Sequence, residues 1–469
     1  MPVQRPAFAG APCGVHCGPM AEAQPSYCVA VIGGAVAGAE VAGALAERGI
    51  EVAVFEQNRR PYGKIEDGLP RWHVALREKE YQTIGAKLSL PNVHFVPRTE
   101  IGRDVGFREI TDDWGFTGVV LACGAWRDRP LPVEGADAYV DRGLIYQNPF
   151  IVWFNHSGDP GYDGPTFEAR DGALVVGGGL ASIDVVKVLM LETTRAALRL
   201  RGIEVDLVEM EVKGIPKTLE RHGLAFEDLG LECCTLFYRR SEADMPLMEM
   251  PDGADEKRRE KVYAGRKKML AKAMEKYRFR FEPLCAPDGL IVEGGRLVGL
   301  RFRRTAIEKG RVVLLDETFE RRGCYTISSI GSIPKEISGI PMRGELFAFT
   351  DWEIGRLPGY PTVFSAGNVV TGKGNIVASR KHAREVSSTV LEAFLGVGAD
   401  GHAGEEAIAD ALAADAREAA TRIADAIAVA PALAADTLAA VRERVHKRQQ
   451  AVGYGGDYAA WVRAGSGSS

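Results

Sequence analysis

Two segments of this chain each combine a short apolar strand, a glycine-rich turn and a helix. The first spans 27–56, and the second begins at Ala173 and returns in a delayed strand at 234–238. A strand, a helix and a second strand in this order form the smallest unit of a parallel sheet with helices on its faces. The sequence therefore predicts an α/β protein built around two such units.

The size and composition of the chain exclude several other classes. Its 469 residues predict about three structural units, or two large ones, at roughly 150 residues per domain. With 46% hydrophobic and 26% charged residues, it has enough apolar material for a large core, so neither a small binding module nor wholesale disorder is expected. A formal charge of −5 gives no overall attraction to nucleic acid or anionic lipid.

The compartment is also constrained by the sequence. No apolar run reaches the roughly 20 residues that span a bilayer, and 1–25 lack the pattern of a secretory signal. Eight cysteines in a chain of this length are too dilute for a disulfide scaffold. We therefore expect a cytoplasmic protein in a reducing compartment, without a membrane partner.

The first glycine-rich turn has the pattern of a dinucleotide site. A pyrophosphate binds at a helix N-terminus, where free N–H groups face it, and glycines let the backbone approach closely. Gly33, Gly34 and Gly38 supply this turn, although Ala35 stands where the middle glycine of G-x-G-x-x-G is expected. Glu56 ends the next strand, eighteen residues after Gly38, where a carboxylate can accept hydrogen bonds from ribose. The alternative interpretation is an ordinary tight β-α turn.

The second turn has a different partner at the end of its next strand. Gly177, Gly179 and Ser182 form G-x-G-x-x-S at the start of a helix, and Arg239 and Arg240 occupy the position that the acid holds in the first unit. Guanidinium groups bind a 2′-phosphate well, so this unit favours NADPH over NADH. The alternative interpretation is that the two arginines are simply solvated at the end of the strand. One unit ending in an acid and one ending in arginines predict FAD and NADPH together, with hydride transfer between them.

Five segments, taken in order, are similar to one group of flavoproteins. They are RPYGKIEDGLPRWH at 60–73, LACGAWRDRPLPVEGAD at 121–137, NPFIVWFNHSGDP at 148–160, VVGGGLASIDVVKVLM at 175–190 and YRRSEADMP at 238–246. In this order they resemble the adrenodoxin-reductase type of ferredoxin–NADP reductase and the related NADPH-oxidising small subunit of glutamate synthase. The resemblance runs from about Tyr27 to Leu395.

The resemblance implies two Rossmann-like, glutathione-reductase-like domains, one inserted in the other. It divides the chain into a flexible N-terminus (1–25), a first FAD-binding part (26–142), an NADP-binding domain (143–324), a second FAD-binding part (325–399), a helical C-terminal extension (400–463) and a disordered tail (464–469). The extension is Ala-rich with apolar residues at helical spacing, and Pro431 breaks it, so we expect surface helices there.

The resemblance also implies which residues bind the cofactors. For FAD these are Gly33, Gly34, Ala35, Gly38, Glu56, Gly63, Gly124, Gly367, Asn368, Gly374, Asn375 and Ile376, and for NADPH they are Gly177, Gly179, Leu180, Ser182, Arg239 and Arg240. Asn368 replaces the tryptophan of the family, and Lys64 replaces an apolar residue near the flavin. His73 is the candidate catalytic residue, placed to hydrogen-bond near the flavin edge or to relay a proton, and its alternative role is structural.

The acceptor of the electrons is less constrained. Neither C-x-x-C nor C-x-x-x-x-C occurs, which argues against a disulfide acceptor, and Cys13 and Cys17 alone cannot hold a [4Fe–4S] cluster, so no metal is predicted. The segment 257–280 contains eleven basic residues against Glu260 and Glu275. As a helix it would present a positive face to an acidic ferredoxin or another iron–sulfur protein, or would simply be a solvated helix.

The leading hypothesis is thus an oxidoreductase that takes a hydride from NADPH onto FAD and passes single electrons to a ferredoxin-like protein. Two other enzymatic roles stay open, namely the electron-input subunit of a larger redox complex and a flavin monooxygenase. A non-enzymatic flavoprotein scaffold is a third hypothesis, motivated by Ala35 and Asn368. The direction of electron flow and the oligomeric state are not specified by the sequence.

Overall fold

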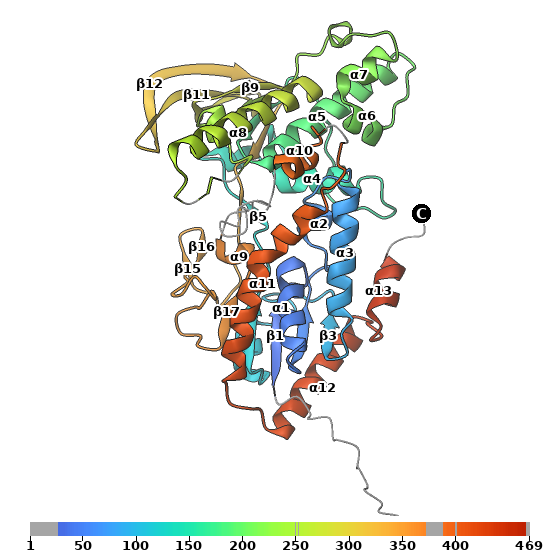
Figure 1. Ribbon diagram of the computed structural model, residues 1–469, viewed down its shortest axis with the longest axis vertical. Helices are drawn as coiled ribbons and strands as arrows, with labels where there is room; N and C mark the ends of the chain where they lie inside the picture. The colour runs from blue at the N-terminus through green and yellow to red at the C-terminus, as the bar shows by residue number, and fades with distance from the viewer. Residues whose placement is uncertain (1–26, 249, 252, 372–387, 399–400, 466–469) are drawn as a thin grey trace, which may run out of the picture.

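A computed structural model describes residues 27–248, 250–251, 253–371, 388–398 and 401–465 (Figure 1). It is an α/β structure with two parallel sheets, one in the lower and one in the upper half of Figure 1, which confirms the predicted fold class. The predicted flexible N-terminus and the predicted cofactor residues Gly374, Asn375 and Ile376 lie outside the described residues. Of the predicted disordered tail, 464–465 belong to the last helix and 466–469 lie outside the described residues.

The first sheet has the strand order β17-β4-β1-β2-β3, and all its pairs are parallel. Its strands are largely apolar because both faces of the sheet are covered. In chain order they are β1 (Cys28–Ile32), β2 (Glu51–Phe55), β3 (Val93–Val96), β4 (Gly118–Leu121) and β17 (Val363–Ser365). The last strand comes from a distant part of the chain, so this sheet is built from two separate segments.

Helices from both ends of the chain cover the first sheet. On one face lie α1 (Val36–Ala46), α3 (Val74–Leu88), α11 (Ala407–Ala428) and α13 (Tyr458–Gly465), and on the other lie α12 (Ala435–Ala451) and the π-helical turn η1 (Glu109–Asp113). Alanines of α11 such as Ala420 are fully buried against α1, because small side chains let two helices approach closely. The C-terminal helices are present as predicted and Pro431 lies between them, but they complete the first core rather than covering its surface.

The second sheet has the order β6-β13-β7-β8-β9 and is also parallel throughout. Its strands are β6 (Leu144–Tyr146), β7 (Leu174–Gly177), β8 (Thr235–Phe237), β9 (Arg280–Glu282) and β13 (Thr326–Ser329). The helices of this part are α4 (Gln147–His156), α5 (Leu180–Arg199), α8 (Glu256–Tyr277) and α10 (Ser388–Phe394). By sheet membership the chain leaves this domain after Ser329, later than the boundary expected at 325.

Additional elements are inserted between the strands of the second parallel sheet. An antiparallel sheet of β10 (Cys285–Glu293), β11 (Arg296–Glu308) and β12 (Arg311–Arg322) extends from it, with β12 largely exposed. The insertion at 192–232 begins as a continuation of α5 and then forms α6 (Leu207–Lys213), α7 (Ile215–Glu220) and the 3-10 turn η3 (Phe226–Leu229). None of the described helices is long and apolar enough to cross a bilayer.

The chain crosses between the two halves on adjacent strands. The outgoing β5 (Arg127–Asp128) and the returning β14 (Ser332–Ile333) form a two-stranded antiparallel sheet. The remaining short elements are α2 (Lys64–Asp67), the 3-10 turns η2 (Ala136–Tyr139) and η4 (Glu242–Asp244), β15 (Met342–Arg343), β16 (Leu346–Phe347) and α9 (Asn368–Thr371). Because both crossings lie together, residues from both halves meet beside them.

Candidate functional site

A cleft of about 900 Å³ lies between the two halves, and both glycine-rich turns open into it. Ala35, Val36 and Ala37 line it from the turn after β1, and 177–181 line it from the turn after β7. Ligands of parallel α/β sheets bind outside the carboxyl ends of the strands, where these turns lie. The volume is in the range of cofactor and substrate sites. Both turns that the sequence predicts as cofactor turns thus open into one common cavity.

The first turn depends on two close backbone approaches. Gly33 has φ +102°, and a side chain there would place Cβ 2.6 Å from the carbonyl oxygen of Ala122. A Cβ on Gly38 would overlap the carbonyl oxygen of Gly33. These two glycines do not line the cleft, and their role is to bring the start of α1 close to the sheet.

Ala35, the departure from the expected motif, is accommodated by a second glycine. A Cβ on Gly63 would lie 2.9 Å from the methyl carbon of Ala35, so the absence of a side chain at Gly63 leaves room for that methyl group. Ala35 precedes α1 in extended conformation and its side chain does not cap the helix, so the first N–H groups of α1 have no side-chain partner from this residue. The helix end keeps the donors that an anion would use.

Glu56 does not line the cleft, contrary to what its predicted ribose contact requires. Its carboxylate is 5% exposed and accepts hydrogen bonds from the backbone N–H groups of Gly34 and Asn58, both at 2.9 Å. Burial raises the pKa of Glu56 to about 7, although these hydrogen bonds act in the opposite direction. In this structure Glu56 therefore stabilises the first turn through its hydrogen bond with Gly34, and its contact with ribose stays a prediction.

The second turn is equally crowded. A Cβ on Gly177 would overlap the carbonyl oxygen of Ser329 in the neighbouring strand β13, and a Cβ on Gly178 would overlap the ring of Tyr238. Gly179 precedes α5, and Ser182 is buried with its hydroxyl donating to the carbonyl oxygen of Gly179 at 2.6 Å. Leu180, the first residue of α5, lines the cleft.

The two arginines after β8 have different surroundings. Arg239 is exposed and lines the cleft, and within the described part of the chain no hydrogen bond or ion pair holds its guanidinium. Arg240 instead donates from Nη2 to the carbonyl oxygen of Gly310, 3.1 Å away in the turn between β11 and β12. Of the predicted phosphate-binding pair, Arg239 is therefore the one whose guanidinium faces the cleft without a protein partner.

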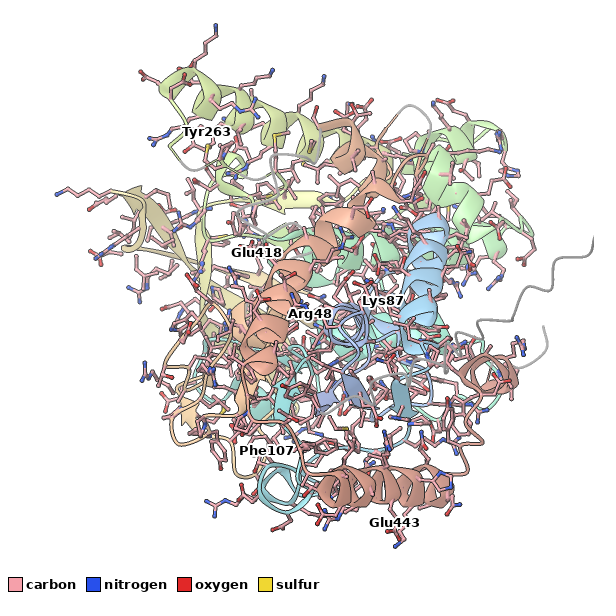
Figure 2. All side chains as sticks on the ribbon, turned by 60° about the horizontal axis from the view of Figure 1, so that its bottom comes forward. Arg48, Lys87, Phe107, Tyr263, Glu418 and Glu443 are labelled. Carbon is pink, nitrogen blue, oxygen red and sulfur yellow. The ribbon has the colours of Figure 1, made fainter. Side chains whose placement is uncertain are left out.

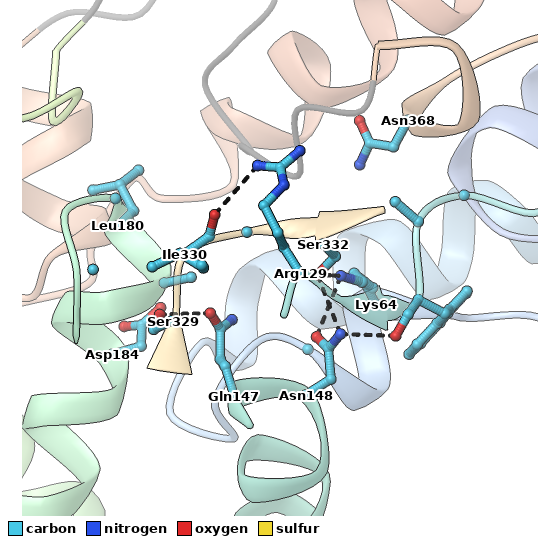
Figure 3. A pocket seen from close by; sticks show the side chains of 18 of the residues that line it. Lys64, Arg129, Gln147, Asn148, Leu180, Asp184, Ser329, Ile330, Ser332 and Asn368 are labelled. Carbon is cyan, nitrogen blue, oxygen red and sulfur yellow. Dashed lines mark hydrogen bonds between the residues drawn. The ribbon is translucent and has the colours of Figure 1, made fainter. Parts of the chain in front are cut away.

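The floor of the cleft lies between the two turns and contains the partly buried side chain of Lys64 (Figure 3). Lys64 donates from Nζ to Ser332 Oγ at 3.0 Å and to Asn148 Oδ1 at 3.3 Å. Asn148 in turn donates from Nδ2 to the carbonyl oxygen of Trp126 at 2.9 Å. Burial lowers the pKa of Lys64 to about 8, and Asp128 opposes this shift. A majority of Lys64 side chains are therefore charged at neutral pH.

Other lining residues include several that the sequence predicted and several that it did not. Gly63, Gly124, Gly367 and Asn368 line the cleft as predicted. A Cβ on Gly367 would lie 2.6 Å from the methyl carbon of Ala37, which explains the glycine there. Other residues that line the cleft were not predicted from the sequence, namely Trp126, Arg129, Gln147, Asn148, Ser329, Ser332, Leu412, Asp415 and Ala416. Those from α11 belong to an Ala-rich helix that has no motif, so only the structure reveals them.

His73 does not line the cleft, so the structure does not bring the candidate catalytic residue to the cofactor turns. It is fully buried and stacks on Phe394 with 4.5 Å between ring centroids. The indole Nε1 of Trp72 donates to His73 Nε2 at 3.2 Å, and His73 Nδ1 lies 2.8 Å from Glu405 Oε2. Because an indole N–H can only donate, Nε2 is the acceptor nitrogen and Nδ1–H donates to Glu405. Both nitrogens are thus occupied by the protein.

Glu405 connects His73 to a larger buried network. His402 lies between two carboxylates, with Nε2 2.7 Å from Glu211 Oε2 and Nδ1 3.0 Å from Glu405 Oε2. Glu211 also pairs with Lys187 Nζ at 2.7 Å and accepts a hydrogen bond from the hydroxyl of Tyr277 at 2.6 Å. With His402 and Lys187 protonated, two cations face two carboxylates, and the network is balanced in charge.

The charges of this network are stabilised by one another. Burial lowers the pKa of His402, but hydrogen bonds to Glu211 and Glu405 outweigh it and raise that pKa above its ordinary value. Burial likewise raises the pKa of each carboxyl, yet Lys187 and His402 lower the pKa of Glu211, and hydrogen bonds from His402 and His73 lower that of Glu405 to about 2. Asp184, which lines the cleft, lies 4.0 Å from His73 Nε2 and is the nearest link between the network and the cavity.

Three members of the network also have the chemistry of metal ligands. His73, His402 and Glu405 place one possible ligand atom each within 4.8 Å of one another. The indole N–H of Trp72 needs the lone pair of His73 Nε2, so the proton of this ring lies on Nδ1. Nδ1 faces Glu405 and is the nitrogen that would have to bind the ion. The hydrogen bonds therefore favour a proton over a metal between these groups, and the absence of a metal stays a prediction.

Comparisons with known proteins agree with this geometry. No protein-family model matches the chain. It is similar to NADPH:adrenodoxin oxidoreductase of Arabidopsis thaliana (26% identical over 158 residues, 32% of this chain and 30% of the relative) and to the glutamate synthase [NADPH] small chain of Bacillus subtilis (28% over 171 residues, 36% and 33%). The matches thus span about a third of these relatives, and the predicted resemblance is confirmed.

A solved structure covers more of the chain. FprA of Mycobacterium tuberculosis in complex with NADPH matches 91% of this chain and 91% of its own, with a TM-score of 0.61 and 17% sequence identity. The putative oxidoreductase AegA of Escherichia coli is 24% identical over 396 residues, 79% of this chain and 49% of its own. The structural likeness at this identity supports the two-domain fold.

The charge-balanced network predicts a particular dependence of stability on pH. Because the pKa of His402 is raised in the folded state, its contribution is complete below its ordinary pKa of about 6.5 and is lost as pH rises through the raised value. We expect His402→Gln to lower the free energy of unfolding by about 3 kcal/mol near pH 6, with a smaller difference at higher pH. Urea unfolding from pH 5 to pH 9 measures this.

His446→Gln, on the exposed side of α12, is the matched control and is expected to change stability little at any of these pH values. A difference between the wild type and His402→Gln that stays constant over the whole range would show that the proton on His402 does not contribute.

Proposed function

We propose that this chain is an NADPH-dependent FAD oxidoreductase that passes electrons to an iron–sulfur protein. The observation that carries the proposal is the shared cleft, into which two helix N-termini open from two separate parallel sheets. Two nucleotides bound at these turns would extend toward the same floor. A hydride can pass between two rings only if they approach to van der Waals contact, and a common cleft is the arrangement that allows it.

The residues of the first turn fit the FAD pyrophosphate. The N-terminus of α1 supplies N–H donors, and Gly63 and Gly367 keep side chains away from the turn at Ala35 and Ala37. When bound, FAD would supply a ring that accepts two electrons together and releases them one at a time. The chain itself would orient the ring and exclude water from it.

The residues of the second turn fit NADPH. The N-terminus of the long helix α5 offers the pyrophosphate site, and Leu180 supplies an apolar wall at its first turn. Arg239 lines the cleft next to Tyr238, so its guanidinium is the candidate partner of the 2′-phosphate. FprA, the structural neighbour, was solved in complex with NADPH.

The partner is proposed from surface charge together with the relatives. Figure 2 shows the side chains of α8, on which Tyr263 is labelled, projecting outward from one end of the molecule. The exposed basic residues of α8 are Lys257, Arg258, Arg259, Lys261, Lys267 and Lys268. Others of the predicted basic segment serve the fold, since Arg266 is buried and donates to the carbonyl oxygens of Ala243 and Met248.

An acidic, ferredoxin-like protein suits this exposed part of α8, because opposite charges steer association and orient the encounter. One relative is named for a reaction of NADPH with adrenodoxin. A second candidate function is the electron-input subunit of a larger enzyme, which the similarity to two glutamate synthase small chains favours. Co-purification with a large subunit would distinguish this role from that of a separate reductase.

The first test of the proposed function is the cofactor itself. We expect the purified chain, or the chain reconstituted with FAD, to be yellow, and anaerobic NADPH to bleach the visible flavin band with about one equivalent. Absorption spectroscopy under argon measures both. A chain that stays colourless after incubation with FAD, or whose bound flavin does not react with NADPH, contradicts the proposal.

Separate substitution of the two arginines tests the nucleotide preference. Arg239→Ala is expected to raise the KM for NADPH at least about tenfold and to leave the KM for NADH nearly unchanged, because only NADPH carries the 2′-phosphate. Arg240→Ala, whose guanidinium binds Gly310, is the control and is expected to have a smaller effect. The measurement is KM and kcat for each nucleotide with an artificial electron acceptor. Equal losses with both nucleotides would remove Arg239 from the phosphate site.

Salt dependence tests the docking surface. We expect the rate of ferredoxin reduction to fall at least about threefold between roughly 0.05 and 0.3 M salt, because screening weakens steering. The double variant Lys267→Glu with Lys268→Glu is expected to be slow at low salt and nearly insensitive to salt. Lys447→Glu, exposed on α12, is the control of equal charge change per site. A flat salt response in the wild type would exclude α8 as an electrostatic docking surface.

A further inference from the structure

Lys64 is a cationic group at the floor of the cleft, between the two glycine-rich turns (Figure 3). Two arginines also line the cleft, but Arg129 pairs with Glu345 at 2.9 Å and Arg239 lies at the end of β8 beside the second turn. Within the described residues no carboxylate forms an ion pair with Lys64, and its two acceptors are neutral. The positive charge of Lys64 is therefore not neutralised by direct contact.

The position of this charge is fixed from three directions. Lys64 begins α2 directly after Gly63, which lies against Ala35 of the first cofactor turn, and both of its acceptors come from the region where the chain crosses between the halves. Ser332 lies on β14 and Asn148 lies near the start of α4. The ring of Trp126 lies 5.5 Å from Nζ and covers another side. The ammonium is held in place before any ligand binds.

The hydrogen-bond count leaves one donor free for a ligand. An ammonium group has three N–H donors, and two of them are directed to Ser332 and Asn148 in the described structure. The third has no described acceptor, and Lys64 lines the cavity. A carbonyl oxygen or ring nitrogen of a bound ligand can complete the set. A ligand that gains negative charge would gain most from this contact.

We propose that Lys64 stabilises the negative charge that a redox ring acquires in this cleft, and thereby makes that ring easier to reduce. The inference rests on the proposed function. When NADPH gives up a hydride, it becomes NADP⁺, and the accepting ring gains two electrons and one proton, so its charge becomes more negative by one. An ammonium fixed beside the ring lowers the energy of that product more than that of the uncharged oxidised ring.

The test compares the FAD-loaded full chain with Lys64→Met and Lys64→Arg. Lys64→Met keeps the length and removes the charge, whereas Lys64→Arg keeps the charge. Lys447→Met, on the exposed surface of α12, is the matched control for loss of one lysine. Two readouts do not involve NADPH, namely the flavin midpoint potential, measured against a reference dye during enzymatic or photochemical reduction, and the affinity for sulfite, an anion that adds to the oxidised ring.

We expect Lys64→Met to shift the two-electron reduction equilibrium at least tenfold toward the oxidised form, which is a potential about 30 mV more negative. Sulfite affinity is expected to fall at least tenfold for the same reason. Lys64→Arg and Lys447→Met are expected to stay within about threefold of the wild type. An unchanged potential and an unchanged sulfite affinity in Lys64→Met would overturn the proposal, even if turnover falls, because a purely structural lysine would affect turnover without affecting the potential.

A second variant covers the case in which Lys64→Met does not retain FAD. Asn148→Ala with Ser332→Ala leaves the charge in place and removes both of its acceptors, so the ammonium loses its fixed position. The expected result is a shift of about threefold in the same direction, and no shift would contradict the proposal. A wild type that binds no FAD would contradict the proposed function instead, so the two failures are distinguishable.

Discussion

The close approach of backbone to backbone at two turns determines most of what this chain can do. At Gly38 and at Gly177 a single added carbon would overlap a carbonyl oxygen of a neighbouring segment. Because those side chains are absent, α1 and α5 begin directly at the ends of their strands and direct their free N–H groups into one cavity. The cleft, its electrostatics and the proposed chemistry all depend on these two contacts.

Local sequence patterns were sufficient for the elements that form this arrangement. Apolar runs such as 28–32 and 174–177 predict buried parallel strands, and the glycines after them predict the turns, because each signal lies within a few residues. Gly63, Gly124 and Gly367, which the family resemblance indicates, also line the cleft. Local patterns say less about the partners of a side chain. The carboxylate of Glu56 accepts hydrogen bonds from the backbone N–H groups of Gly34 and Asn58, and its motif position alone does not reveal this.

His73 illustrates the same limit more strongly. A histidine at a fixed distance from a family motif predicts a place near the ring, but Trp72 and Glu405 occupy both of its nitrogens. Glu405 is more than three hundred residues away in sequence, and no periodicity links the two. The helices before and after Pro431 were predicted as surface elements. Instead, alanines of α11 complete the core around α1, and Leu438, Val441 and Val445 of α12 complete the core on the other face of the sheet. Long-range packing decides such cases, and a single sequence does not contain it.

The buried network around His402 and Glu211 has a consequence for the mechanics of the molecule. It joins the start of α3 in one half to α5, α6 and α8 in the other, through a segment near the C-terminal end of the chain. Buried charged groups that pair with one another resist separation, since separating them would leave unpaired ions inside the protein. This network therefore holds the two halves together beside the cleft, and the distance between the two glycine-rich turns is fixed once the chain has folded. The cleft is then preorganised for its ligands, and little reorganisation of the protein would be needed to align them.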